Sequence, residues 1–205
     1  MVITGLGAVT PIGNDAPSTW RAALDGRSGV DWIRSFDASD FPVRIAAEVK
    51  DFDPTTAASP KEVRKLDRNV LLALAAGREA VADAGLDGAY DPAGVGILFG
   101  TAIGGFLGMM EQHDVLRERG HTRVTPTFIP SVLPDAASGQ LAISLGYRGP
   151  NYAPVSACAT GSHAVGEAAE MIRRGAAEAV LAGGGEACMH PLILAGFCAM
   201  RGLAA

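Results

Sequence analysis

Apolar and polar positions alternate along the chain in segments that predict strands and helices in turn. Short apolar runs bounded by glycine or proline are typical of buried parallel strands, and apolar positions three and four residues apart are typical of helices packed on a sheet. The expected strands are residues 2–4, 44–49, 95–99, 151–156 and 179–182. The expected helices are residues 18–24, 61–84, 105 onward, 136–145 and 161–174. This order predicts an α/β fold with a mostly parallel sheet layered with helices.

Glycines and prolines mark the expected ends of these elements, because glycine adopts the left-handed conformation that ends a helix and proline lacks an N–H group. The expected helix-ending glycines are Gly26, Gly85, Gly146 and Gly175, and the prolines of an irregular connection are Pro126, Pro130 and Pro134. Without repeats, linkers or charge blocks, residues 1–205 are expected to form one domain. Residues 197–205 stay apolar and helix-compatible without a cap, so we expect a longer natural chain.

One uncharged segment has an alternative interpretation. Residues 92–110 place glycines at GxxxG spacing, a pattern also found in membrane helices. A buried strand over residues 95–99, a glycine-rich turn and a helix from about residue 105 describe the segment better. The sequence therefore predicts no membrane partner.

Composition narrows the function classes. Of 205 residues, 48% are hydrophobic and 19% are charged, which is ordinary globular usage and excludes intrinsic disorder. Lysine and arginine number 17 against 22 aspartate and glutamate, so the chain lacks the positive field that gathers nucleic acid or an anionic membrane surface. Three cysteines without framework spacing, and no N-terminal signal segment, predict a cytoplasmic protein.

The segment Gly5-Leu6-Gly7 follows an expected strand, as a dinucleotide-binding turn does. Thr10 stands in place of the third glycine of that motif, and Pro11 stands where the phosphate-binding helix begins. A nicotinamide-dependent oxidoreductase is therefore a distant alternative.

Cys158 lies between a strand-like run and an expected helix. The free N–H groups and positive dipole end at a helix N-terminus stabilise a thiolate, and the same groups can bind an oxyanion. The small neighbours Ala157, Ala159 and Gly161 leave room for an acyl group, as in a nucleophile elbow. These residues predict a nucleophile, and a buried cysteine that acts as a small hydrophobic residue remains the alternative.

The other cysteines and the histidines carry weaker signals. Cys188 and Cys198 lack this setting and are expected in the core or in a pocket wall. The absence of CxxC and HxxxH pairs argues against a zinc site. His163 lies five residues after Cys158, about 500° around a helix, so we expect it to point away from the thiol and to pack rather than act as a base.

A basic stripe is expected on this acidic chain. In a helix over residues 61–84, positions i, i+3, i+4 and i+7 share one face, and they hold Lys61, Arg64, Lys65 and Arg68. Such a stripe is either a solvated face or a landing site for an acidic partner. Only the landing site predicts an affinity that falls with added salt.

Several motifs occur together and in order. They are residues 2–13 (VITGLGAVTPIG), 100–105 (GTAIGG), 126–130 (PTFIP), 148–150 (RGP), 156–161 (SACATG) and 182–186 (AGGGE). With these motifs, nearly the whole chain resembles the N-terminal half of type II β-ketoacyl-acyl-carrier-protein synthases, the elongating condensing enzymes of fatty acid synthesis. The resemblance implies a thiolase-like fold in which residues 1–205 form the first of two similar α/β halves.

The resemblance also implies roles for individual residues. Cys158 would accept an acyl chain from the acyl carrier protein, with its own N–H as one oxyanion-hole donor, before a decarboxylative Claisen condensation with the malonyl carrier protein. Residues that border the acyl pocket would be Met109, Phe128, Ile193 and Phe197. Residues that contact the acidic carrier protein would be Arg64, Lys65, Arg68, Arg123 and Arg201.

Further implications concern specificity and assembly. Ile193 is larger than the glycine often found at its position, which implies a shorter acyl chain. Two chains would pair as a homodimer through strands near the nucleophile. The family needs no metal or organic cofactor, since the phosphopantetheine arm arrives attached to the substrate.

The chain also departs from the family pattern. Two histidines, a lysine and a Gly-Phe-Gly segment of the C-terminal half are missing, and none of the histidines present matches them, namely His113, His121, His163 and His190. We therefore expect this chain alone not to complete condensation, and to expose apolar surface. A polyketide ketosynthase, a related thiolase and a non-catalytic chain-length partner subunit remain alternatives. Cys158 argues against the last, because such partners usually carry another residue there.

Overall fold

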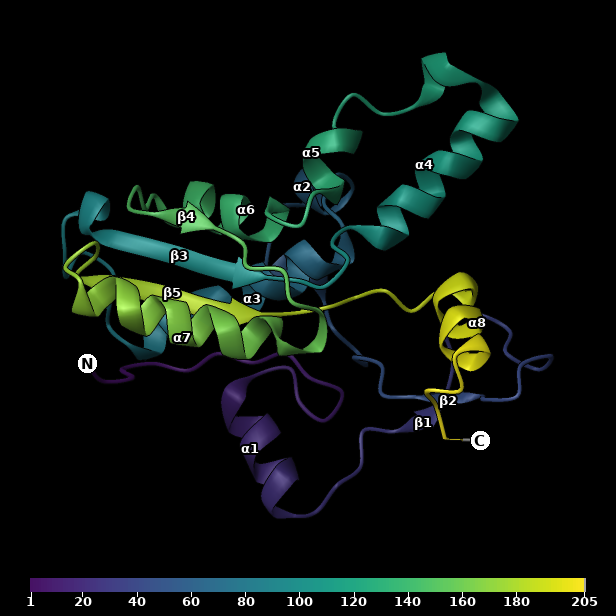
Figure 1. Ribbon diagram of the computed structural model, residues 1–205, viewed down its shortest axis with the longest axis horizontal. Coiled ribbons are helices and arrows are strands. Elements are labelled where there is room, and N and C mark those ends of the chain that lie inside the picture. Colours follow the sequence, from purple (N-terminus) through teal and green to yellow (C-terminus); the bar gives the residue numbers. More distant parts are fainter. Residues whose placement is uncertain (205) are drawn as a thin grey trace.

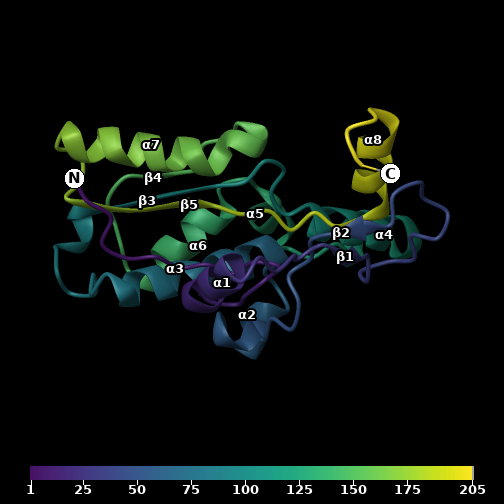
Figure 2. The same ribbon diagram turned by 90° about the horizontal axis from the view of Figure 1, so that it is seen from below.

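A three-stranded parallel sheet forms the centre of the structure, a computed structural model that describes residues 1–204. β3 (Val95–Gly100) lies between β4 (Asn151–Tyr152) and β5 (Ala179–Gly184) and is parallel to both. Figure 2 shows α7 (Thr160–Arg173) on one face of the sheet, and α3 (Arg68–Asp83) and α6 (Ala136–Leu145) on the other. The expected α/β layering is confirmed.

The other elements lie beside this sheet or extend beyond the carboxyl end of β3 (Figure 1). The remaining helices and strands are α1 (Ala16–Leu24), β1 (Asp31–Trp32), β2 (Ile45–Ala46), η1 (Pro54–Thr56), α2 (Pro60–Val63), η2 (Pro92–Gly94), α4 (Phe106–Arg119), η3 (His121–Arg123), α5 (Phe128–Val132), η4 (Ala157–Ala159) and α8 (Pro191–Ala199). β1 and β2 pair antiparallel, and the sequence pattern did not predict β1.

The core lies on both faces of β3, all of whose residues are buried. Val95, Ile97 and Phe99 belong to the cluster formed with α3 and α6. Leu98 belongs to a second cluster with Met171 of α7. Successive side chains of a strand point to opposite faces, so a continuous apolar run is what a central strand covered on both sides requires.

Several predicted elements are confirmed nearly to the residue. β3, α6 and α7 match their expected bounds within two residues, and α1 begins two residues earlier than expected. Gly146, with φ 75°, ends α6 in the left-handed conformation that the sequence predicts. The strands expected at residues 44–49 and 151–156 are much shorter, β2 and β4 being two residues each.

The strand expected at residues 2–4 is wrong for the part of the chain that the structure describes. This segment pairs with no strand there, and Val2 and Ile3 are 78% and 77% exposed. The segment that follows lies along α3, where the N–H groups of Leu6 and Ala8 donate to the carboxylates of Asp83 and Glu79, each at 2.9 Å. Carboxylates of a helix thus accept the N–H groups that a neighbouring strand would otherwise accept. Since Gly7 lies against the backbone of α3, this segment does not form a dinucleotide-binding turn.

The single helix expected over residues 61–84 is also wrong. It is divided into α2 and α3, because Asp67 has extended backbone angles and its carboxylate accepts the N–H of Asn69 at 3.1 Å, as an N-cap does. Ser59 and Glu62 form a capping box at the start of α2. The basic residues therefore do not share one helix face.

The uncharged segment 92–110 divides as predicted into β3, a glycine-rich turn and the start of α4, and η2, which was not predicted, precedes β3. Within residues 1–204, no helix is both long enough and apolar enough to cross a membrane. The connection expected to be irregular contains the short helix α5, in which Pro130 is the third residue. Proline is tolerated there because N–H groups in the first turn have no helical partner.

The apolar and helix-compatible C-terminal segment is helical as far as Ala199, the end of α8, and residues 200–204 belong to no helix or strand. Ala205 lies outside the described residues. Leu194 anchors α8 in a small cluster with Ala38 and Val43.

Candidate active site

Cys158 lies in η4, between the end of β4 and the start of α7 (Figure 1). Its side chain is exposed. The predicted position at a helix N-terminus is confirmed, and the alternative of a buried cysteine is wrong. The carboxyl ends of parallel strands form the edge of a sheet at which ligands bind in open α/β folds.

The loop before Cys158 has an unusual backbone. Ala157 has a φ of 52°, which an L side chain rarely adopts. The hydroxyl of Thr160, which is 4% exposed, accepts the N–H of Ser156 at 2.9 Å and donates to the carbonyl of Ala157 at 2.7 Å. Thr160 thereby holds the main chain on the N-terminal side of Cys158, as the turn of a nucleophile elbow requires.

Two glycines allow this loop to sit directly on the sheet. A Cβ on Gly100, at the end of β3, would overlap the Pro154 carbonyl and the Thr160 methyl group. A Cβ on Gly184, at the end of β5, would lie 2.9 Å from the Cα of Gly161 in the first turn of α7. The glycines of the GTAIGG and AGGGE motifs thus serve close backbone approach, a role that the motifs alone did not reveal.

Glu186 joins these glycine-rich loops. Its carboxylate accepts the N–H groups of Ala102 at 2.9 Å and Ile103 at 3.1 Å. The turn after β3 is therefore held by the loop after β5, at the same edge of the sheet as Cys158.

His163 differs from the expectation of a packed residue, because its side chain is exposed. Its Nδ1 lies 2.6 Å from the hydroxyl of Ser156 in the loop before Cys158. Cys188 and Cys198 are half-buried, in keeping with a core or wall position. Burial, and then the charge of Glu186, raises the pKa of the Cys188 thiol. Among the described residues, no cluster of three or more His, Cys, Asp or Glu side chains is placed to hold a metal ion.

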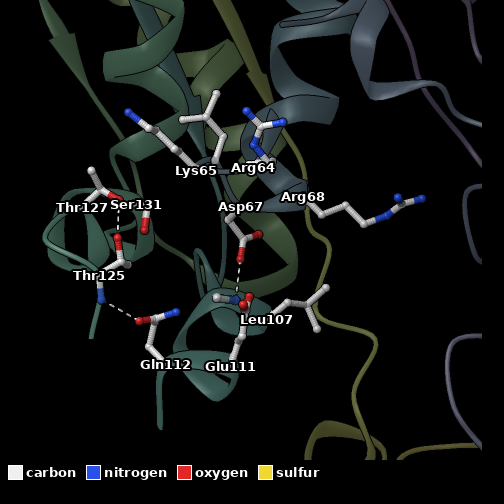
Figure 3. Close-up of a pocket in the computed structure, with 12 residues that line it drawn as sticks. Arg64, Lys65, Asp67, Arg68, Leu107, Glu111, Gln112, Thr125, Thr127 and Ser131 are labelled. Atoms are coloured by element: carbon white, nitrogen blue, oxygen red, sulfur yellow. Dashed lines mark hydrogen bonds between the residues drawn. The ribbon is translucent and has the colours of Figure 1, made fainter. Parts of the chain in front are cut away.

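Three of the predicted carrier-contacting residues meet at one cavity. Arg64, Lys65 and Arg68 line a cavity of about 230 Å³ between the α2–α3 junction and α4. Figure 3 shows their side chains spreading outward from the rim rather than converging inside. Arg123 lies in η3, two residues before Thr125, which also lines the cavity. Arg201 follows α8 and lines no described cavity.

Asp67 was missed as a site residue by the sequence analysis. It is 7% exposed and accepts the N–H of Gly108 in α4 at 2.8 Å, in addition to capping α3 (Figure 3). Burial raises the pKa of its carboxyl, against the lowering effect of the Gly108 and Asn69 N–H groups. An N-cap residue before the apolar run of α3 was the available signal.

The residues predicted to border an acyl pocket lie on different elements. Met109 is on α4, Phe128 on α5, and Ile193 and Phe197 on α8. Figures 1 and 2 show α8 separated from α5. None of the four lines the first cavity or a second one of about 400 Å³, which Leu72, Leu107 and Met189 help to form. Their acyl-binding role, and the chain length implied by Ile193, stay predictions.

Cys158 is thus exposed at a turn between a parallel strand and a helix, at the edge of a sheet covered on both faces. The chain belongs to the β-ketoacyl synthase family, because residues 1–205 match the family's N-terminal domain. It is 44% identical to 3-oxoacyl-[acyl-carrier-protein] synthase 2 of Staphylococcus aureus (strain COL) and 42% identical to the protein of that name from Synechocystis sp.. Each match covers 99% of this chain and 49% of the relative, so the chain spans about half the length of these curated relatives.

Solved structures agree with this assignment. The ishigamide ketosynthase/chain length factor matches with a TM-score of 0.87 and 26% identity over 99% of this chain and 51% of that one. A β-ketoacyl synthase from Burkholderia phymatum matches with a TM-score of 0.83 and 27% identity over 99% of this chain and 50% of that one. A type II polyketide ketosynthase in complex with its acyl-carrier protein matches with a TM-score of 0.76 and 25% identity, over 96% and 53%. The thiolase-like fold is confirmed.

Proposed function

We propose that this chain is the nucleophile-bearing part of an elongating 3-oxoacyl-[acyl-carrier-protein] synthase of fatty acid biosynthesis, with Cys158 as the acyl acceptor. The observation that carries the proposal is the exposure of Cys158 on a left-handed turn at the N-terminus of α7. The 44% identity to synthases of this name over 99% of the chain supports the same activity.

The first half-reaction follows from the chemistry of a thiolate. The Sγ of Cys158 attacks the carbonyl carbon of an acyl thioester, and the Cys158 N–H helps to bind the oxyanion that forms. The bond between that carbon and the carrier's sulfur then breaks. The acyl group stays on Cys158, and the carrier leaves as a thiol with the proton that Cys158 gave up. Condensation with a malonyl unit needs the remaining half found in the relatives.

The acyl carrier protein is the proposed partner, and the proposed docking surface consists of Arg64, Lys65, Arg68 and Arg123. These cations are exposed around one corner of a chain whose net charge is −5. Outward-spreading cations suit an acidic protein surface better than a small anion, which needs converging groups. A similar ketosynthase was solved in complex with its acyl-carrier protein. Arg201 stands apart from this surface and is proposed as a separate contact.

A homodimer and a cytoplasmic location complete the proposal. Within residues 1–204, β4 is an edge strand of the sheet, and it leads into the Cys158 loop. Tyr152 and Val155, at this edge, are 39% and 54% exposed. An unpaired strand edge with exposed apolar side chains favours pairing with a second copy.

The test is the intact mass of the chain after incubation with an acyl carrier protein thioester. We expect a mass increase of one acyl group in the wild type and in Cys198→Ala, and none in Cys158→Ala. An adduct that persists in Cys158→Ala contradicts the assignment of the nucleophile. A folded wild-type sample without an adduct contradicts acyl acceptance by this chain.

A polyketide ketosynthase is the second candidate, since two of the similar structures are ketosynthases of polyketide or chain-length-factor systems. The identity to them is 25% and 26%, against 44% to the fatty acid synthase relative. Competition between simple acyl and polyketide thioesters for Cys158 separates the two, and a preference for the polyketide thioester would favour the second.

A further inference from the structure

Cys158 sits on a loop that needs to be held in place from several directions. Ala157 is not glycine, yet its φ is 52°. A residue in this region persists only when its surroundings determine its conformation. The contacts that hold the loop therefore decide where the Cys158 thiol lies.

Thr160 supplies part of this support. Its hydroxyl bonds the N–H of Ser156 and the carbonyl of Ala157, so it fixes main-chain atoms only. The side chain of Ser156 is left free by these bonds.

His163 holds the Ser156 side chain. Its Nδ1 is 2.6 Å from the Ser156 hydroxyl, within hydrogen-bond distance. Thr160 and His163 are three residues apart on α7, so both side chains project from one face of the helix toward the loop. One face of α7 thus forms hydrogen bonds with both the main chain and the Ser156 side chain of the loop, on the N-terminal side of Cys158.

We propose that His163 is a positioning residue for Cys158, which acts by binding the Ser156 hydroxyl and holding the nucleophile loop against the first turn of α7. The inference rests on the proposed role of Cys158 as nucleophile. It assigns to His163 no proton transfer and no contact with substrate.

The test is a double-mutant cycle read out by alkylation of Cys158 with iodoacetamide, followed by mass spectrometry of the digested peptides. A single hydrogen bond is worth about two- to tenfold in an equilibrium or a rate. We expect His163→Ala and Ser156→Ala each to slow Cys158 alkylation by about that factor, and the double variant to be no slower than either one. His163→Asn restores most of the rate, because its carboxamide can place a polar atom near the position of Nδ1.

Internal and matched controls limit the result to the loop. The alkylation rates of Cys188 and Cys198 in the same samples stay unchanged, and so does the Cys158 rate in His121→Ala, a substitution at an exposed histidine of η3. If His163→Ala does not fold, Ser156→Ala removes the same hydrogen bond from its other end.

Additive effects of the two substitutions, or an unchanged rate in both single variants, would overturn the inference. The alkylation assay uses no carrier protein, so it fails or succeeds separately from the acyl-transfer test of the proposed function. Retained acyl transfer with additive alkylation effects rejects only the role of His163.

Discussion

Thr160→Val is the most direct test of how the nucleophile loop is held. Valine has nearly the shape of threonine without the hydroxyl, so the substitution removes two hydrogen bonds. One is donated by the Ser156 N–H to the Thr160 hydroxyl at 2.9 Å, and the other is donated by that hydroxyl to the Ala157 carbonyl at 2.7 Å. Thr160 is 4% exposed, so water does not readily replace the lost partner.

The expected cost follows from these two bonds. Each contributes a net of about 0.5 to 1.5 kcal/mol, so the free energy of unfolding falls by about 1 to 3 kcal/mol. For a chain of this size, a loss of about 2 kcal/mol lowers Tm by about 4 to 8 °C. The left-handed turn at Ala157 also loses the bond on its carbonyl, so Cys158 alkylation should change together with stability.

Urea denaturation and thermal melting measure the loss, with Thr160→Ser and Thr122→Val as controls. Thr160→Ser keeps the hydroxyl and should retain most of the stability, and Thr122 is exposed, so its substitution should cost less than about 0.5 kcal/mol. A Thr160→Val variant within about 0.5 kcal/mol of the wild type would refute the view that this hydroxyl holds the loop.

Three further predictions concern the core, the α2–α3 junction and the docking surface. Leu141→Ala removes a side chain that is 0% exposed and should cost about 2 to 5 kcal/mol of unfolding free energy, whereas Ile143→Ala on the same helix, at a 76% exposed site, should cost almost nothing. Burial raises the pKa of the Asp67 carboxyl above its value in the unfolded chain. The contribution of this carboxyl to stability is therefore fully present below the unfolded pKa and is lost as pH rises through the folded pKa. In urea denaturation measured across pH, Asp67→Asn should lack this loss. In a binding titration, Lys65→Glu should weaken carrier-protein binding about tenfold at low salt and less at high salt. Arg27→Glu, at an exposed site that lines neither described cavity, should leave binding unchanged. Equal effects of the two substitutions would contradict the proposed surface.

The elements that sequence analysis predicted best are those whose signals are local. β3 is a continuous apolar run because both of its faces are covered, and α6 ends where Gly146 can adopt a φ of 75°. The position of Cys158 at the start of α7 follows from small residues between a strand-like run and a helical pattern. Each of these signals lies within a few residues of the feature that it predicts.

The errors arose where distant residues decide the conformation. Residues 2–4 looked like a strand, but they pair with no strand in the described part of the chain. The N–H groups of Leu6 and Ala8, which follow, bond instead to Asp83 and Glu79, more than 70 residues away. The break at Asp67 was readable as an N-cap, yet its second bond, to the N–H of Gly108, joins it to α4 across 41 residues. No pattern near Asp67 identifies that partner.

The sequence by itself therefore determined the α/β class, the family and the cysteine that is the candidate nucleophile, because periodicity, glycine placement and motif order are local properties of the chain. Only the tertiary structure decided that Arg64, Lys65 and Arg68 meet at the rim of one cavity. It also decided that Gly100 and Gly184 bring the Cys158 loop against the sheet, and that His163 bonds Ser156 instead of packing in the core. These features depend on which backbone segments lie against one another and on which polar groups form hydrogen bonds. Both are decided only when elements from separate parts of the sequence pack together.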